Sequence, residues 1–299
     1  MTPDPPYRER VPRRATTRRV REIDYRVFEW GNPRDRVLFL LHGWGDSGAS
    51  FQFVVDALRG NWFVVAPDWR GFGASGHNRG AYWFPDYLAD LDVLLRHYSA
   101  DAPARLVGHS MGANAAALYA GACPERVSAL VNIEGFGLAD SEPRGAPAHY
   151  RRWLEAVSAR AAPRGYANFD ELAVRIRARS PRMSEDMARY VARLWASPDA
   201  DGRIRLTADP AHRWPNAVQY RRAEAEACWR AVRAPVLLVV GAETSFAAGA
   251  REWRQSDSGA LPFADARVVS VPGAGHMLHF EQPARLAAVI EDFLGTLAR

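Results

Sequence analysis

The chain has 299 residues, of which 48% are hydrophobic and 24% are charged, as is usual for a globular protein with a full-sized core. Its net charge is +5, and every Lys-or-Arg position is arginine. No apolar run approaches the roughly 18 residues that a membrane span needs, and none follows the N-terminal arginines as a secretory signal would require, so we expect a cytoplasmic protein without a membrane span.

The first element in chain order is the basic N-terminal segment, residues 1–20. Eight arginines lie between Arg8 and Arg26, a density that can indicate nucleic-acid binding. No nucleic-acid-binding motif accompanies them. We therefore predict a flexible basic arm that leads into the first strand, and no nucleic-acid partner.

From Arg21 onward, strand-like and helix-like segments alternate, which is typical of a parallel sheet flanked by helices. The strand-like segments are Val37–Leu41, Trp62–Ala66, Leu106–Gly108, Val127–Ile133, Val236–Val240 and Val268–Val271. The helix-like segments are Phe51–Leu58, Tyr87–His97, Met111–Ala122 and Pro283–Leu297. This pattern predicts an α/β fold whose core comprises residues 21–136 and 234–299.

Residues 137–233 interrupt this alternation and favour several amphipathic helices. Open α/β sheets bind ligands at the carboxyl ends of their strands, and a segment inserted at this point would cover that edge. We therefore predict that residues 137–233 form a helical cap, or lid. The segment contains 18 arginines and 12 acidic residues, a surplus of six positive charges.

Two cysteines, Cys123 and Cys228, lie far apart and match no metal or redox spacing. We expect both to be unpaired packing residues, as in a reducing compartment. The sequence predicts neither a metal nor a cofactor.

The pentapeptide Gly-His-Ser-Met-Gly occupies residues 108–112. The residues before it favour a strand and those after it favour a helix. A strand–turn–helix unit holds its serine on a strained, exposed turn, and the glycines allow close backbone approach. We predict that Ser110 is a nucleophile and that the Met111 amide is an oxyanion donor. The alternative role of Ser110 is a helix N-cap.

Two glycine-rich turns supply further candidates. His42-Gly43-Trp44-Gly45 follows a predicted strand, so the Trp44 amide is the expected second oxyanion donor, and His42 is interpreted as structural. A second turn, Gly273-Ala274-Gly275, precedes His276 and leaves that histidine free to act as a general base. His279 competes for this role, but it lies closer to the terminal helix and lacks the preceding glycines.

These motifs, with APDWRGFGASG at 66–76 and GAGHMLHFEQP at 273–283, resemble those of the α/β-hydrolase superfamily in order and spacing. The resemblance covers nearly the whole chain from about Arg21. It implies an α/β-hydrolase fold, with a mostly parallel eight-stranded sheet flanked by helices, a helical lid after strand six, and a nucleophile–acid–histidine triad in that chain order. It also implies that Val127–Ile133 is strand six, that Val236–Val240 is strand seven, and that Asp68 and Arg70 are structural.

The acid of the triad departs from the common pattern of this superfamily. Most members carry an aspartate at the third position after the glycine that ends strand seven, here Gly241, but this chain has Thr244 there. Glu134, at the tip of strand six, matches an arrangement found in a branch of the haloalkane dehalogenases and is the predicted acid. Glu243 is the alternative acid. A serine at position 110 excludes a dehalogenase or epoxide hydrolase of the usual type, which uses an aspartate nucleophile.

The predicted activity is that of a carboxylesterase, which cleaves an ester, thioester or lactone of a small, largely apolar acyl substrate through an acyl-enzyme. The expected pocket residues are Trp44, Phe136, Trp153 and Met277, with Trp195 and Trp214 as further cap tryptophans.

Several alternatives remain open on this reading. The same triad supports carbon–carbon hydrolysis, acyl transfer and perhydrolysis. The unfilled aspartate position at Thr244 supports an alternative of another class, a non-catalytic ligand-binding protein. The HGWG motif also resembles that of pimeloyl-carrier methyl esterases, and with the charge of residues 137–233 it suggests an anionic substrate or an acidic acyl carrier as partner. The oligomeric state is not predicted.

Overall fold

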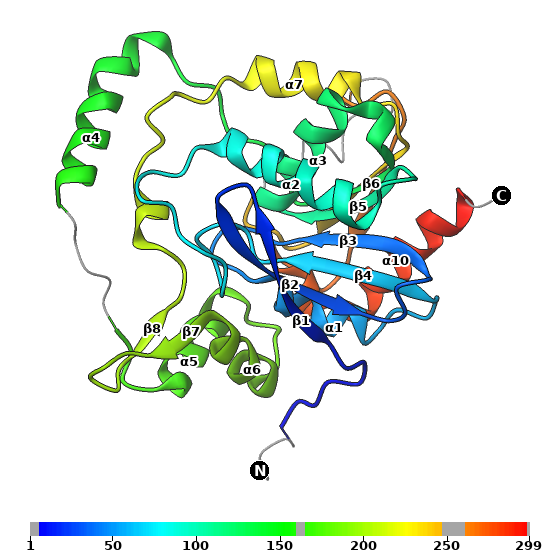
Figure 1. Ribbon diagram of the computed structural model, residues 1–299, viewed down its shortest axis with the longest axis horizontal. Coiled ribbons are helices and arrows are strands. Elements are labelled where there is room, and N and C mark those ends of the chain that lie inside the picture. Colours follow the sequence, from blue (N-terminus) through cyan, green and yellow to red (C-terminus); the bar gives the residue numbers. More distant parts are fainter. Residues whose placement is uncertain (1–5, 160–164, 247–260, 298–299) are drawn as a thin grey trace.

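The computed structural model describes residues 6–159, 165–246 and 261–297. Its centre is an eight-stranded sheet in the order β1-β2-β4-β3-β5-β6-β9-β10, parallel from β4 onward and antiparallel at β1 and β2 (Figure 1). The strands are β1 (Arg14–Val20), β2 (Ile23–Trp30), β3 (Arg36–Leu41), β4 (Trp62–Pro67), β5 (Ala104–His109), β6 (Val127–Ile133), β9 (Val236–Gly241) and β10 (Ala266–Val271). The predicted α/β-hydrolase architecture, a mostly parallel eight-stranded sheet flanked by helices, is confirmed.

Helices cover both faces of this sheet, which explains why its central strands are continuous apolar runs. One apolar core lies between the sheet and helices α2 (Phe84–Tyr98), α3 (Met111–Ala122) and α7 (Arg222–Ala231). The core on the other face involves α1 (Gln52–Val55) and α10 (Pro283–Thr296). Every residue of β4 and β9 is buried, because each of these strands packs against both layers.

The prediction of a flexible arm is wrong for Arg14–Val20, which form the edge strand β1. This strand pairs antiparallel with β2 from Arg14 opposite Glu29 to Val20 opposite Ile23. Its exposed residues include Arg14 and Arg19, and long charged side chains keep an edge strand from pairing with other chains. High charge therefore indicated an exposed edge at these residues and not a disordered segment.

Between β6 and β9 the chain forms helices α4 (Ala146–Ala159), α5 (Phe169–Arg179) and α6 (Glu185–Trp195), followed by the short pair β7 (Ala196–Pro198) and β8 (Ile204–Leu206). Figure 1 shows α4 away from the sheet, at the edge of the molecule, and none of its residues is buried. No helix in the described ranges is long and apolar enough to cross a membrane.

The predicted C-terminal boundary of the cap at 233 is wrong, because α7 belongs to the core. Trp229 of α7 is 1% exposed and stacks on Phe263 at a ring distance of 5.7 Å. Helices α3 and α7 cross so closely at Gly121 that a Cβ there would lie 2.0 Å from the carbonyl oxygen of Cys228. We therefore use the term cap for residues 137–221. Both Cys123 and Cys228 are free thiols.

Candidate active site

Ser110 lies on a strained turn between the end of β5 and the start of α3. Its backbone has φ 52° and ψ −113°, a left-handed region that non-glycine residues rarely adopt. Its amide donates a hydrogen bond to the Ile133 carbonyl at 2.8 Å. A Cβ at Gly112 would lie 2.2 Å from the Leu41 carbonyl oxygen, so only glycine fits there. This geometry holds the Ser110 side chain at the carboxyl ends of the strands.

The glycine-rich turn after β3 lies directly beside Ser110. A Cβ at Gly43 would lie 3.2 Å from the Cβ of Ser110 and 2.9 Å from Nδ1 of His109. Neither the Trp44 amide nor the Met111 amide donates a hydrogen bond to any residue that the structure describes. Met111 is the first residue of α3, where amides lack an intrahelical acceptor and the helix dipole favours negative charge. Two candidate oxyanion donors therefore lie on the two turns that meet at Ser110.

His276 lies on the loop between β10 and α9 (Leu278–Glu281). Its Nδ1 is 3.1 Å from Oε2 of Glu134. Its Nε2 makes no hydrogen bond within the described parts of the chain, and His276 and Ser110 line the same cavity. Its carbonyl oxygen accepts a hydrogen bond of 2.8 Å from Nε2 of His109, the residue before Ser110. This hydrogen bond connects the loop that carries His276 to the turn that carries Ser110.

Glu134 has a fully buried carboxylate with three hydrogen-bond donors. Oε1 accepts from the Gly241 amide at 2.8 Å, and Oε2 accepts from the Thr244 hydroxyl at 2.5 Å in addition to facing His276. Such donors compensate the desolvation of a buried anion. The backbone of Glu134 is also strained, with φ 58°, and its amide donates to the Val239 carbonyl at 3.0 Å. Strands β6 and β9 together fix this carboxylate.

Glu243, the alternative acid, is exposed and makes a different contact. Its Oε1 accepts a hydrogen bond from the Gly273 amide at 3.2 Å, and its own amide donates to the Ala274 carbonyl at 2.9 Å. It therefore supports the turn that precedes His276, whereas Glu134 contacts the imidazole itself.

The other two histidines of these motifs, His42 and His279, are buried and hydrogen-bonded, as structural residues are. His42 is fully buried; its Nε2 accepts from the Trp69 amide at 2.9 Å, so its proton lies on Nδ1, which donates to the Gly43 carbonyl at 2.7 Å. Burial lowers the pKa of His42, which keeps the ring neutral. His279 is also fully buried, with Nε2 3.0 Å from Oδ2 of Asp46. Neither ring lines the cavity that contains Ser110.

Asp68 and Arg70 stabilise the loops behind Ser110. The Asp68 carboxylate accepts from the Ser47 hydroxyl at 2.7 Å and from the Gly48 and Ala74 amides at 2.8 Å each. The Arg70 guanidinium donates two hydrogen bonds to the Asp90 carboxylate, of 2.5 and 2.7 Å. These contacts agree with the structural roles expected from the sequence.

One group of described residues has the chemistry of metal ligands. Asp46, His109 and His279 are buried, with one candidate ligand atom of each within 4.8 Å of the others. The Asp46 carboxylate is already bonded to His279 and accepts from the Trp195 indole at 2.8 Å. We interpret the group as a hydrogen-bonded anchor for the turn after β3.

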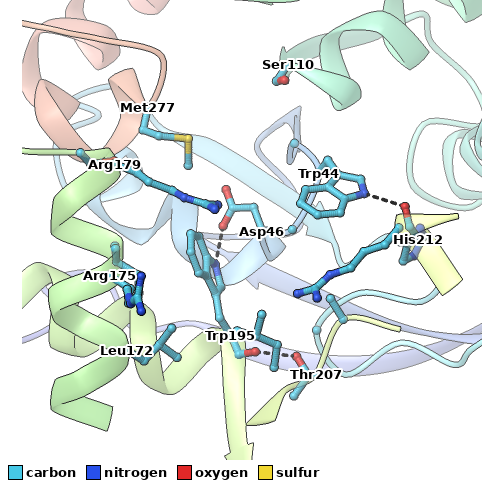
Figure 2. Close-up of a pocket in the computed structure, with 18 of the residues that line it drawn as sticks. Trp44, Asp46, Ser110, Leu172, Arg175, Arg179, Trp195, Thr207, His212 and Met277 are labelled. Carbon is cyan, nitrogen blue, oxygen red and sulfur yellow. Dashed lines mark hydrogen bonds between the residues drawn. The ribbon is translucent and has the colours of Figure 1, made fainter. Parts of the chain in front are cut away.

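A cavity of about 1400 Å³ opens at Ser110 and His276. Trp44 and Met277 line it as expected, together with Trp195 (Figure 2). Trp214 lines a smaller neighbouring pocket. Two expected pocket residues, Phe136 and Trp153, are absent from the described lining of the cavity.

Their positions in the fold explain this correction. The Phe136 side chain is buried in the apolar core that includes α3 and α7, and Trp153 lies on the peripheral helix α4. The sequence analysis missed Phe246, whose exposed ring lies 4.5 Å from that of His276. Its only signal in the sequence is its position two residues after Thr244.

Comparisons with known proteins identify the family of this chain. The profile of the alpha/beta hydrolase fold family matches residues 36–283. A serine hydrolase-like protein from Danio rerio is 25% identical over 279 residues, which cover 89% of this chain and 83% of the relative. A 2-(acetamidomethylene)succinate hydrolase from Mesorhizobium japonicum is 27% identical over 260 residues, covering 86% and 87% of the two chains. The solved thioesterase domain from the curacin biosynthetic pathway superposes with a TM-score of 0.82 at 23% identity, covering 94% of this chain and 99% of that domain, and shows the fold alone.

Proposed function

Because the chain belongs to the α/β-hydrolase fold family, and is a hydrolase by that membership, we propose that it cleaves carboxylic esters or thioesters through an acyl-enzyme on Ser110. The observation that carries this proposal is the contact of 3.1 Å between Nδ1 of His276 and the buried carboxylate of Glu134. This contact supports Glu134 as the acid of a triad with Ser110 and His276, a role that Thr244 lacks the charge to fill, and it argues against a non-catalytic role.

In the proposed first step, Nε2 of His276 takes the proton of the Ser110 hydroxyl while Oγ attacks the substrate carbonyl. The carbonyl oxygen becomes an oxyanion and accepts hydrogen bonds from the amides of Trp44 and Met111. Glu134 holds the proton of the imidazole on Nδ1 and stabilises the imidazolium that forms. The leaving group then departs with the proton from Nε2.

The second step uses the same groups in the same order. Water enters the position of the leaving group, and Nε2 of His276 removes one of its protons as the oxygen attacks the acyl carbon. The tetrahedral intermediate collapses, the carboxylic acid is released, and Ser110 regains its proton.

Hydrolysis of nitrophenyl esters by the wild-type chain and by Ser110→Ala tests the proposal. We expect turnover by the wild type and a loss of several orders of magnitude in the variant, with an unchanged unfolding midpoint because the change removes one cavity-lining hydroxyl that bonds to no described residue. If the variant keeps more than a few percent of the activity, the nucleophile is another residue.

A further inference from the structure

The charged side chains around the Ser110 cavity fall into two groups. The acidic residues of its lining are Asp46, Glu171 and Asp209. Its arginines are Arg175, Arg179, Arg203 and Arg213. The two groups differ in whether their charged atoms form hydrogen bonds or ion pairs within the protein.

Protein donors occupy all three carboxylates. Asp46 is bonded to His279 and to Trp195, as described above. Glu171 accepts from the Ala167 amide at 2.6 Å, as part of the N-terminal cap of α5. Asp209 accepts from the Tyr82 hydroxyl at 2.7 Å and from the Ala211 amide at 2.9 Å. These hydrogen bonds assign the three carboxylates a structural role in the walls of the cavity.

Three of the arginines have no such partner. Arg203 donates to the Gly165 carbonyl at 2.7 Å. The guanidinium groups of Arg175, Arg179 and Arg213, in contrast, make neither a hydrogen bond nor an ion pair with any described residue. Arg175 and Arg179 are exposed and lie one turn apart on α5, a spacing at which like charges repel. The free charge that faces the cavity is positive.

Other cap arginines show that partners are common in this part of the chain. Arg189 forms ion pairs with Asp170 at 3.0 Å and with Glu185, and Arg205 pairs with Asp199. The unpartnered pair on α5 thus lies where a ligand has access. Figure 2 shows Arg175 and Arg179 extending from this helix on the side of the cavity away from Ser110.

Apolar side chains accompany the arginines along the same wall. Leu172 and Ile176 belong to the cavity-lining face of α5, and Met277 follows the base His276 in the chain. A ligand that reaches from Ser110 to the arginines therefore passes apolar groups before it meets positive charge. Guanidinium groups bind carboxylates through paired hydrogen bonds, so a terminal carboxylate fits this arrangement.

We propose that the substrate carries a carboxylate remote from the scissile bond, and that Arg175 and Arg179 bind it. This inference rests on the proposed function, since it assigns the substrate class of the Ser110 site. It names specificity-determining residues on the cap, outside the groups that perform the bond cleavage.

Two matched substrate pairs test the inference. The first pair is 4-nitrophenyl hydrogen adipate and its methyl-capped counterpart, which differ in one carboxylate. The second pair, 6-acetoxyhexanoate and its methyl ester, places the carboxylate on the alcohol side. The ratio of kcat/KM for the charged ester to that for the neutral ester measures the contribution of the carboxylate, and we expect the wild type to prefer the charged member of at least one pair about tenfold or more.

The double variant R175Q/R179Q should abolish this preference, mainly through KM. Arg177→Gln is the matched control, because Arg177 lies on the same helix but not in the cavity lining; its ratio should stay within about twofold of wild type. Added salt should reduce the wild-type preference. The inference would be overturned if the wild type cleaved the charged and the neutral member of each pair at equal rates. It would also be overturned if R175Q/R179Q and R177Q had equal ratios of kcat/KM for the charged to the neutral ester.

The experiments distinguish a failure of the proposed acyl-enzyme function from a failure of the carboxylate-binding inference. Loss of neutral-ester hydrolysis in Ser110→Ala supports the acyl-enzyme whatever the charge preference. If the wild type cleaves none of these esters, titration of Ser110→Ala with monomethyl adipate decides the inference alone. Binding that R175Q/R179Q weakens about tenfold and R177Q does not would uphold it, and binding that is equal in all three backgrounds, or no binding, would refute it.

Discussion

The Thr244 hydroxyl donates a hydrogen bond of 2.5 Å to the same Glu134 oxygen that faces Nδ1 of His276. Thr244 occupies the position where most α/β hydrolases carry their acid. In this chain the carboxylate that contacts the imidazole is that of Glu134, directly after the neighbouring strand β6, and the residue at the usual position is one of its hydrogen-bond donors.

We predict that Glu134→Gln lowers turnover by about three to four orders of magnitude, because a neutral amide cannot stabilise the imidazolium or enforce its tautomer. The matched control is Glu243→Gln, which removes an exposed carboxylate whose one hydrogen bond among the described residues is with the Gly273 amide, in the turn before His276. Steady-state kinetics of both variants on one ester measure the difference. Equal losses in the two variants would mean that Glu134 is not the acid.

The next prediction is that a carboxylate at position 244, after strand β9, can replace that of Glu134, after strand β6. In the background of Glu134→Gln, the additional change Thr244→Asp places a carboxylate where its oxygen can approach His276, since the present hydroxyl lies 2.5 Å from Oε2 of Glu134. We expect turnover to rise at least about tenfold above that of Glu134→Gln alone. Thr244→Asn in the same background controls for shape, and equal rates in the Asp and Asn double variants would argue against a shared position.

The two histidines of the C-terminal loop should respond in opposite ways. His279→Gln leaves the buried Asp46 carboxylate without its imidazole, so we predict a loss of about 3–5 kcal/mol in the free energy of unfolding, with labelling of Ser110 retained at low temperature. His276→Gln should change stability little and abolish labelling. Denaturant titration together with a covalent serine probe measures both effects. The reverse pattern would make His279 the base.

The pH dependence of stability should contain a contribution from His212. Its ring is stacked between Phe72 and Tyr82, at 3.8 and 3.6 Å, and burial lowers its pKa to about 4. The unfolded chain, with a histidine pKa of about 6.5, binds a proton that the folded chain does not bind between pH 6.5 and 4. The free energy of unfolding therefore falls as the pH falls through this window, by about 3 kcal/mol at most from this residue.

His212→Gln should flatten this slope between pH 6.5 and 4.5. The buried rings of His42 and His109, whose pKa values burial also lowers, contribute with the same sign and remain in the variant. Replacement of the exposed His97 by Gln is the control and should leave the slope as in the wild type. An unchanged slope in His212→Gln would show that this ring titrates alike in the folded and the unfolded chain.

The core of the fold could be predicted from the sequence because its signals are local. The apolar runs of β4 and β9 and the glycines around Ser110 each identify one element without knowledge of the rest. Glu134 could be predicted as the candidate acid because its chain position fits a known alternative to the missing aspartate at Thr244, and the structure places its carboxylate beside His276. The contacts that fix its carboxylate, from Gly241 and Thr244, depend on the parallel pairing of β6 with β9.

The errors concern features that only tertiary packing decides. The arginines of β1 indicate an exposed edge as readily as a disordered arm, and pairing with β2 distinguishes the two. Helix α7 has the composition of the cap, but Gly121 lets it pack against α3. Phe136 follows Glu134 in the chain, yet its ring turns into the core, so proximity in sequence to the acid did not predict proximity to the substrate.

Covalent labelling with a fluorophosphonate probe, read by peptide mass spectrometry, tests the central claim most directly. The account predicts a single adduct on Ser110 in the wild type, no adduct in Ser110→Ala, and labelling slowed by about three to four orders of magnitude in Glu134→Gln. An adduct on another serine, or labelling in Glu134→Gln at the wild-type rate, would contradict it.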